Sequence, residues 1–195
     1  MDLLKFEREY ILQGYTRIAG CDEAGRGPLA GPVSCAAVIM PLDEINPEIN
    51  DSKKLSPKKR DLLYGYIIKN ALAYSSVFID NEIIDSINIL NATKRGMEAA
   101  LKALKTAPDI ALIDAVGKLN TDIPIVPIIH GDALSYNIAA ASIIAKVERD
   151  RLMSDYARQY PQYGFEKHMG YPTAAHYAAL REHGTCPIHR KSFLK

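Results

Sequence analysis

The sequence predicts an α/β fold in which a mixed five-stranded sheet is flanked by helices. Five short runs rich in Val, Ile and Ala alternate with segments that carry the 3.6-residue hydrophobic spacing of helices. With 195 residues, of which 48% are hydrophobic, the chain is long enough to bury a sizeable core in one domain. The order of these runs along the chain argues for a mixed sheet covered by helices.

The N-terminal half contains three of the predicted strands. Ser56 is a suitable N-cap and Pro57 suits the first helical position, so a helix begins there and continues to about Asn70. The apolar spacing of the next helix is interrupted near Asn91 or Gly96, where we expect a break. The predicted segments are strands 15–21, 34–40 and 73–79 and helices 2–13, 56–70 and 81–105.

The C-terminal half contains two short buried strands and a long helix. The first half of this helix, from Ile138 to Ala145, is almost entirely small or apolar and must be packed on most sides, whereas its second half is charged and expected to be exposed. A last helix is closed by Gly184. The predicted segments are strands 109–116 and 123–129 and helices 135–160 and 173–182. We expect one domain over residues 1–195, with residues 150–195 approximately forming a C-terminal helical extension.

Composition and charge limit the possible environments of the protein. No run approaches the roughly 18 apolar residues of a membrane span, and the charged N-terminus lacks a signal-peptide core, so a cytoplasmic protein without membrane contact is expected. Three cysteines cannot all pair, which favours a reducing compartment. His183, Cys186 and His189 have a spacing that suggests zinc, but a fourth ligand is missing and Pro187 intervenes, so a structural role is predicted.

Nucleic-acid binding would require a local excess of positive charge. Lysines and arginines total 24 against 23 acidic residues, a net charge of only +1. Lys53-Lys54 and the run from Lys58 to Arg60 supply such an excess. A solvated helix face explains the second run equally well. Cations are disfavoured at the positive N-terminal end of a helix, however, so their presence there favours a role in binding.

The stretch from Ile18 to Val33 is the most informative part of the chain. Asp22 and Glu23 end an apolar run and are followed at once by Arg26 between two glycines. Carboxylate oxygens are preferred by hard divalent cations, and glycines let backbone N–H groups approach a phosphate. The pattern indicates a metal site beside an anion site, with a nucleic-acid phosphodiester as the shared substrate.

Two further aspartates follow apolar strands. Asp114 ends one strand, and Asp132 follows the next at the start of a helix, where an N-cap role is the competing interpretation. Ends of strands in α/β sheets often converge on one site. Side chains alternate along a strand, so Asp22 and Glu23 cannot both face one metal from regular β geometry. Either the strand ends at Asp22, or one of the pair acts through its backbone or through water.

The stretch 18–33 resembles the signature of the type 2 ribonuclease H (ribonuclease HII) family, and segments 51–56, 111–115, 131–150 and 170–176 resemble that family in the same order. The resemblance implies a ribonuclease H fold with a C-terminal lobe beside the substrate groove. It also implies an endonuclease that hydrolyses the RNA strand of RNA–DNA hybrids and incises duplex DNA 5′ of embedded ribonucleotides, leaving 3′-hydroxyl and 5′-phosphate ends. A monomer is expected.

The resemblance assigns the site residue by residue. Asp22, Glu23, Asp114 and Asp132 match the four catalytic, metal-binding carboxylates, whose mutual repulsion suggests two divalent cations, Mn²⁺ or Mg²⁺. Gly25, Arg26 and Gly27 would bind the nucleotide at the scissile phosphate, Tyr171 the sugar at an RNA-to-DNA junction, and Lys53 a phosphate or a carboxylate, a role less well supported for Lys146. From the residues alone, Tyr171 suits a loop anchor and His176 a surface position on a helix.

Three features bear on this assignment. Met169 and His130 stand where relatives of this family usually carry lysine, which removes positive charge from two points near the site. The sequence lacks the added N-terminal domain of type 3 relatives, which favours type 2.

Two alternative functions remain: another nuclease or recombinase of this fold acting on DNA, and a non-catalytic hybrid-binding protein, which we expect to have lost a carboxylate.

Overall fold

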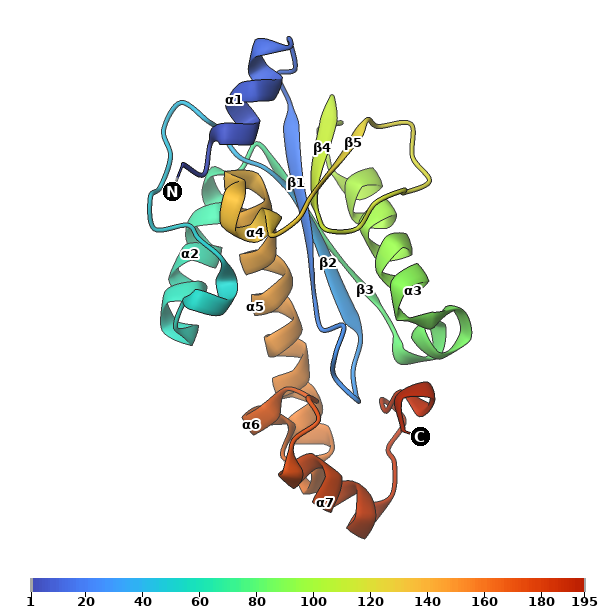
Figure 1. The fold of residues 1–195 in the computed structure, drawn as a ribbon. Helices are drawn as coiled ribbons and strands as arrows, with labels where there is room; N and C mark the ends of the chain where they lie inside the picture. The colour runs from blue at the N-terminus through green and yellow to red at the C-terminus, as the bar shows by residue number, and fades with distance from the viewer. Residues whose placement is uncertain (1, 195) are drawn as a thin grey trace.

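The computed structural model describes residues 2–194, and its core is a five-stranded sheet with helices on both faces (Figure 1). The strands are β1 Ile18–Ala24, β2 Val33–Ile39, β3 Ala73–Ile79, β4 Ile110–Asp114 and β5 Ile125–Ile128. The helices are α1 Lys5–Leu12, α2 Pro57–Asn70, α3 Asn81–Ala103, α4 Gly131–Leu134, α5 Tyr136–Gln159, α6 Phe165–His168 and α7 Ala174–His183, with short 3-10 turns at Ser52–Lys54, Pro161–Tyr163 and Lys191–Phe193.

The sheet has the order β3-β2-β1-β4-β5 and is mixed, as predicted. β1 pairs antiparallel with β2, which pairs antiparallel with β3. On its other side β1 runs parallel to β4, and β4 runs parallel to β5. Because parallel strands end at the same edge, the residues that end β1, β4 and β5 are brought together there.

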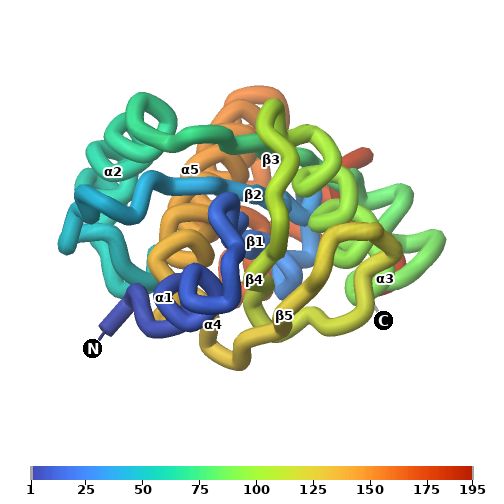
Figure 2. Tube along the Cα trace, turned by 90° about the horizontal axis from the view of Figure 1, so that it is seen from above, coloured from blue at the N-terminus to red at the C-terminus, as the bar shows by residue number. Residues whose placement is uncertain are grey.

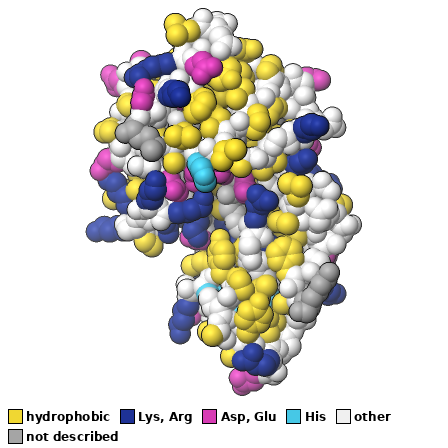
Figure 3. Space-filling model, in the orientation of Figure 1, with side chains coloured by type: hydrophobic (Ala, Val, Ile, Leu, Met, Phe, Trp, Pro, Cys, Tyr) yellow, Lys and Arg dark blue, Asp and Glu magenta, His cyan; other side chains and the backbone are white. Residues whose placement is uncertain are grey.

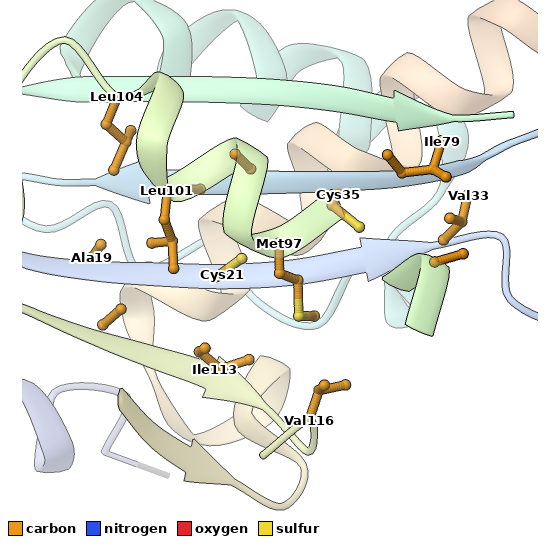
Figure 4. Close-up of a cluster of buried hydrophobic side chains, with 14 of the residues drawn as sticks. Ala19, Cys21, Val33, Cys35, Ile79, Met97, Leu101, Leu104, Ile113 and Val116 are labelled. Atoms are coloured by element: carbon orange, nitrogen blue, oxygen red, sulfur yellow. The ribbon is translucent and has the colours of Figure 1, made fainter. Parts of the chain in front are cut away.

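The two faces of the sheet are covered by different helices (Figure 2). α5 lies on one face together with α1 and α2, and the contact with β1 is close enough that a Cβ atom on Gly20 would lie 2.0 Å from the backbone of Asn137. α3 covers the opposite face, where Met97 and Leu101 pack above Cys21 and Cys35 (Figure 4). The long apolar helix predicted from the sequence is therefore the one that packs most closely on the central strand.

The break in α3 lies at Asn88, so the expectation of a break at Asn91 or Gly96 was wrong. Asn88 has a φ of 67°, and its side-chain oxygen accepts the backbone N–H of Asn91 at 3.1 Å, which caps the second helical segment. Gly96 instead lets α3 approach the sheet, since a Cβ atom there would lie 2.6 Å from the sulfur of Cys35.

A C-terminal lobe extends beyond the sheet and contains the end of α5 together with α6 and α7 (Figure 1). The expectation that the second half of α5 is exposed was wrong on one face, because Arg149 and Met153 are buried against this lobe and the 25–32 loop. Gly184 follows the last residue of α7, as the sequence predicted, and Thr173 caps the start of this helix.

Two further observations concern the whole described chain. Among residues 2–194, no helix combines the length and the apolar character that crossing a membrane requires. Cys21, Cys35 and Cys186 are all unpaired thiols, and the first two are buried in the core.

Candidate active site

Three aspartates from different elements converge at one edge of the sheet. Asp22 comes from β1, Asp114 ends β4, and Asp132 lies in the first turn of α4. Each offers one carboxylate oxygen, and these three oxygens all lie within 4.8 Å of one another. The N-cap position of α4 is occupied by His130, whose side chain makes no capping hydrogen bond, so the competing N-cap interpretation of Asp132 was wrong. The strand ends predicted to converge do so, and their spacing suits a hard divalent cation.

Glu23 lies beside this cluster but is not part of it. β1 continues through Ala24, so the strand does not end at Asp22. Asp22 is paired with Ala36, which packs on the α5 side, and Glu23 with Cys35, which packs on the α3 side. The two carboxylates therefore leave β1 on opposite faces.

One oxygen of Glu23 nevertheless has a partner and the other does not. Arg26 Nη1 donates to Glu23 Oε1 at 3.3 Å. Oε2 is buried and, among residues 2–194, has no hydrogen-bond partner. A buried carboxylate oxygen without a donor is costly unless a cation or water compensates it, so Glu23 also fits a cation site.

Backbone and side-chain hydrogen bonds fix the positions of the aspartates. Asp22 Oδ1 accepts the N–H of Glu23 at 2.7 Å, and Asp114 Oδ1 accepts the N–H of Gly131 at 2.7 Å. Lys53 Nζ donates to Asp132 Oδ2 at 2.8 Å. Of the two lysines suggested from the sequence, Lys53 thus contacts the cluster. Lys146 lines the same cavity but forms an ion pair with Asp150 at 2.7 Å.

The cluster carries more negative charge than its surroundings neutralise. Burial, followed by the neighbouring carboxylates of Glu23 and Asp114, raises the pKa of Asp22 well above its ordinary value. Burial also raises the pKa of Asp114, with a further contribution from Asp132. Burial opposes the charge on Lys53, but its hydrogen bond to Asp132 prevails and raises its pKa. A bound cation would relieve the repulsion among these carboxylates.

The glycine loop forms the wall next to the aspartates. Gly25, Arg26 and Gly27 line a cavity of about 200 Å³ together with Asp22, Asp114, Lys53 and Tyr171. Gly25 has a φ of +94°, and a Cβ atom there would lie 1.9 Å from the Nε atom of Arg149, so both backbone and packing require glycine. Tyr171 is 40% exposed and closes the cavity from the lobe side.

His176 is buried, so its predicted surface position was wrong. Its Nδ1 lies 3.0 Å from the carbonyl oxygen of Tyr171, and its Nε2 lies 3.1 Å from Nε2 of His189. His189 Nδ1 accepts the backbone N–H of Cys186 at 2.9 Å. One assignment satisfies all three contacts: His189 donates to His176, and His176 donates to the carbonyl of Tyr171. This chain of neutral rings holds the loop of Tyr171, and no zinc-binding group forms at His183, Cys186 and His189 within residues 2–194.

The predicted basic run has mixed surroundings. Lys59 forms an ion pair with Glu48. Arg60 Nη1 donates to the carbonyl oxygens of Ser52 and Leu55 at 3.0 and 2.7 Å, which fixes the turn that carries Lys53. Figure 3 shows acidic and basic side chains gathered at the waist between the sheet and the C-terminal lobe. On this face, basic side chains therefore lie close to the acidic ones at the waist.

Sequence reasoning missed two residues that bear on this loop, Arg149 and Arg190. Both are buried and bond only to backbone carbonyl oxygens of neighbouring loops. Neither lies in a pattern that distinguishes it from exposed arginines in the same charged segments.

The fold and the acidic cluster define a class of enzyme. The structure of ribonuclease H2 from Pyrococcus horikoshii OT3 superposes with a TM-score of 0.77 and 25% identity, covering 91% of this chain and 93% of that one. A five-stranded sheet of this kind with aspartates converging at one edge is the architecture of a nuclease of the ribonuclease H fold, a metal-dependent hydrolase.

Sequence comparison gives the family. A family model described as Ribonuclease HII matches residues 19–195. A protein named Ribonuclease HII from Ruminiclostridium cellulolyticum is 54% identical over 193 residues, which cover 99% of this chain and 76% of the relative. Another from Endomicrobium trichonymphae is 52% identical over 193 residues, covering 98% and 92%. The chain belongs to the ribonuclease HII family, and this membership supports ribonuclease H activity on RNA–DNA hybrids.

Proposed function

We propose that this enzyme hydrolyses the RNA strand of RNA–DNA hybrids and also incises duplex DNA 5′ of embedded ribonucleotides, leaving 3′-hydroxyl and 5′-phosphate ends. The observation that carries the proposal is the meeting of two sites in one cavity. The oxygens of Asp22, Asp114 and Asp132 lie within 4.8 Å of one another. The first two of these aspartates line the same cavity as the loop Gly25-Arg26-Gly27. A cation site next to an anion-binding loop suits a phosphodiester.

The carboxylates would hold the cations. Asp22, Asp114 and Asp132 supply oxygens to a common point, and the unpartnered Oε2 of Glu23 is available beside them. The oxygen-only donor set favours Mg²⁺ or Mn²⁺ over softer metals. Two such cations, when bound, supply an activated water and neutralise charge on the departing 3′-oxygen.

The remaining residues of the cavity would bind and orient the substrate. Arg26 is exposed and lies where its guanidinium can meet a phosphate, while its contact to Glu23 sets its direction. Lys53 neutralises Asp132 and so fixes the direction of that carboxylate. Tyr171 presents a partly exposed ring on which a deoxyribose that lacks a 2′-hydroxyl could pack. These residues all belong to one chain, which supports action as a monomer.

A cleavage assay tests the proposal directly. Three substrates are compared in Mg²⁺ and in Mn²⁺: an RNA–DNA hybrid, a DNA duplex with one embedded ribonucleotide, and the same duplex without it. We expect cleavage of the first two only, with products that a DNA polymerase can extend, as 3′-hydroxyl ends allow. Cleavage of the all-DNA duplex would instead favour a DNA nuclease of the same fold, and binding without cleavage would favour a non-catalytic hybrid-binding protein.

A further inference from the structure

Two buried arginines lie beneath the glycine loop without an acidic partner. Arg149 is 1% exposed and Arg190 is 0% exposed. Neither forms an ion pair with a carboxylate within the described part of the chain. Burying an uncompensated cation costs free energy, and an apolar side chain of similar size would fill the same space at lower cost. Packing alone therefore does not explain why these positions carry guanidinium groups.

All three side-chain nitrogens of Arg190 donate hydrogen bonds to the loop. Its Nη2 donates to the carbonyl oxygen of Gly25 at 2.7 Å, its Nη1 to that of Arg26 at 2.9 Å, and its Nε to that of Gly31 at 2.9 Å. The ring of Phe193 lies 5.1 Å from the guanidinium carbon. Three hydrogen bonds and a stacked ring allow this side chain one orientation.

Arg149 holds the other end of the same loop. Its three nitrogens donate to the carbonyl oxygens of Ala30, Pro32 and Met169 at 3.0 to 3.1 Å. The bond to Met169 ties the loop to the segment that carries Tyr171. Arg149 thus sets the spacing between the two walls of the cavity, and Arg190 sets the conformation of the glycine loop itself.

The bonds of Arg190 determine where the amide groups of the loop point. No cis peptide occurs among residues 2–194, and in a trans peptide the C=O and the following N–H point in opposite directions. Because the carbonyls of Gly25 and Arg26 point inward to Arg190, the N–H groups of Arg26 and Gly27 point outward. Both residues are exposed, and within residues 2–194 neither N–H donates a hydrogen bond. Two successive free N–H groups on one side of a loop form an anion-binding concavity.

We propose that Arg190 is a positioning residue for substrate binding, which holds the loop so that the N–H groups of Arg26 and Gly27 receive a phosphate oxygen. The proposal rests on the proposed function, because it is the substrate phosphate that these groups bind. Arg190 itself does not touch substrate. Its fixed positive charge beneath the loop also contributes to the attraction of a phosphate.

The test compares substrate binding with metal binding in variants of Arg190. Arg190→Met fills the space without donating, and Arg190→Lys keeps the charge but cannot supply the three-armed fork. Leu101→Ala, on the buried face of α3, is the control for lost stability. Fluorescence anisotropy in chelator gives the Kd for a labelled RNA–DNA hybrid without turnover, and calorimetry gives the Kd for Mn²⁺. All measurements are made well below the melting temperature of each variant.

We expect Arg190→Met and Arg190→Lys to raise the Kd for hybrid by about tenfold or more, as the loss of a charge-assisted contact would. The Kd for Mn²⁺ should change less than twofold, and Leu101→Ala should change neither. Wild-type affinity in Arg190→Lys would show that charge alone matters and would overturn the positioning role. If Arg190→Met does not fold, the lysine variant decides the question alone.

An Arg26→Gln arm separates this inference from the proposed function. If Arg26→Gln weakens hybrid binding while both Arg190 variants bind normally, the positioning role is refuted and the proposed function stands. If the wild-type protein neither binds nor cleaves the hybrid, the proposed function fails, and the inference fails with it.

Discussion

Replacing Asp114 with Asn should stabilise the metal-free protein while removing its activity. The asparagine has the same shape and can still accept the N–H of Gly131, which Asp114 accepts at 2.7 Å. The change removes one negative charge from a cluster whose oxygens lie within 4.8 Å of one another. Stability and activity are therefore expected to move in opposite directions, which a merely structural aspartate would not produce.

The size of the effect follows from the spacing. Two unit charges 4.8 Å apart repel by about 3 kcal/mol at an effective dielectric constant of about 20. Asp114 has two such neighbours, but Lys53 neutralises much of the charge on Asp132. We therefore expect a net gain of about 1–2 kcal/mol in the free energy of unfolding, or about 2–8 °C in Tm.

The assay combines thermal melting with single-turnover cleavage. In chelator at pH 8 Asp114→Asn should melt above the wild type, and in excess Mn²⁺ the order should reverse, because only the intact site gains from binding the ion. Cleavage in Mg²⁺ should fall by about 10²–10⁴-fold, since several kcal/mol of transition-state stabilisation are lost. The exposed Asp122→Asn serves as the control and should change neither quantity. Near-wild-type cleavage, or a lower Tm than the wild type in chelator, would refute the reasoning.

Three further predictions concern substrate binding and the C-terminal lobe. Tyr171→Ala should lower kcat/KM on a single embedded ribonucleotide about tenfold more than on a long RNA tract, because a stacking contact contributes about 1–3 kcal/mol only at the junction. Tyr177→Ala, similarly exposed, is the control, and equal losses on both substrates would make Tyr171 a loop anchor. Hybrid affinity should fall with salt, and Arg26→Gln should reduce the slope of log K against log salt by about 1, whereas an unchanged slope would place the phosphate elsewhere. Burial, with help from a neighbouring histidine, lowers the pKa of His189 to about 4. The native state then binds this proton more weakly than the unfolded state, so the contribution of His189, up to about 3 kcal/mol, is present above pH 6.5 and lost as pH falls towards 4. His189→Gln should flatten this part of the stability profile, and an unchanged profile would contradict the assigned ring network.

Much of the fold could be predicted because its signals are local. The N-cap at Ser56, the apolar first half of α5 and the apolar runs that form the central strands are each decided by neighbours in sequence. The break in α3 was misplaced because an asparagine with a positive φ can end a helical segment without a glycine or proline, and several asparagines lie in that stretch. His176 was misplaced because the sequence of α7 does not indicate which face of this helix packs against the rest of the C-terminal lobe.

The candidate site also contains residues that local sequence signals reveal and residues that only the fold reveals. The convergence of strand-end aspartates could be predicted because acidic residues after apolar runs are unusual. The resemblance to the ribonuclease HII family was needed to choose Asp132 and to give the glycine loop a role in binding. The exit of Asp22 and Glu23 on opposite faces also follows from strand alternation alone. The sequence does not show which of these carboxylates lie close enough to bind one cation. That depends on the pairing of β1 with β4, which joins residues about ninety positions apart.

The buried arginines show why the remainder escaped prediction. Arg190 acts on Gly25 and Arg26, which lie 165 and 164 residues earlier in the chain, and its acceptors are backbone carbonyls that every residue type possesses. A side chain that recognises backbone leaves no complementary residue type for a sequence pattern to reveal. The glycines of the loop are visible in the sequence because they are needed where the backbone is exposed to substrate. The residue that orients that backbone becomes visible only when the fold brings the C-terminal segment beneath it.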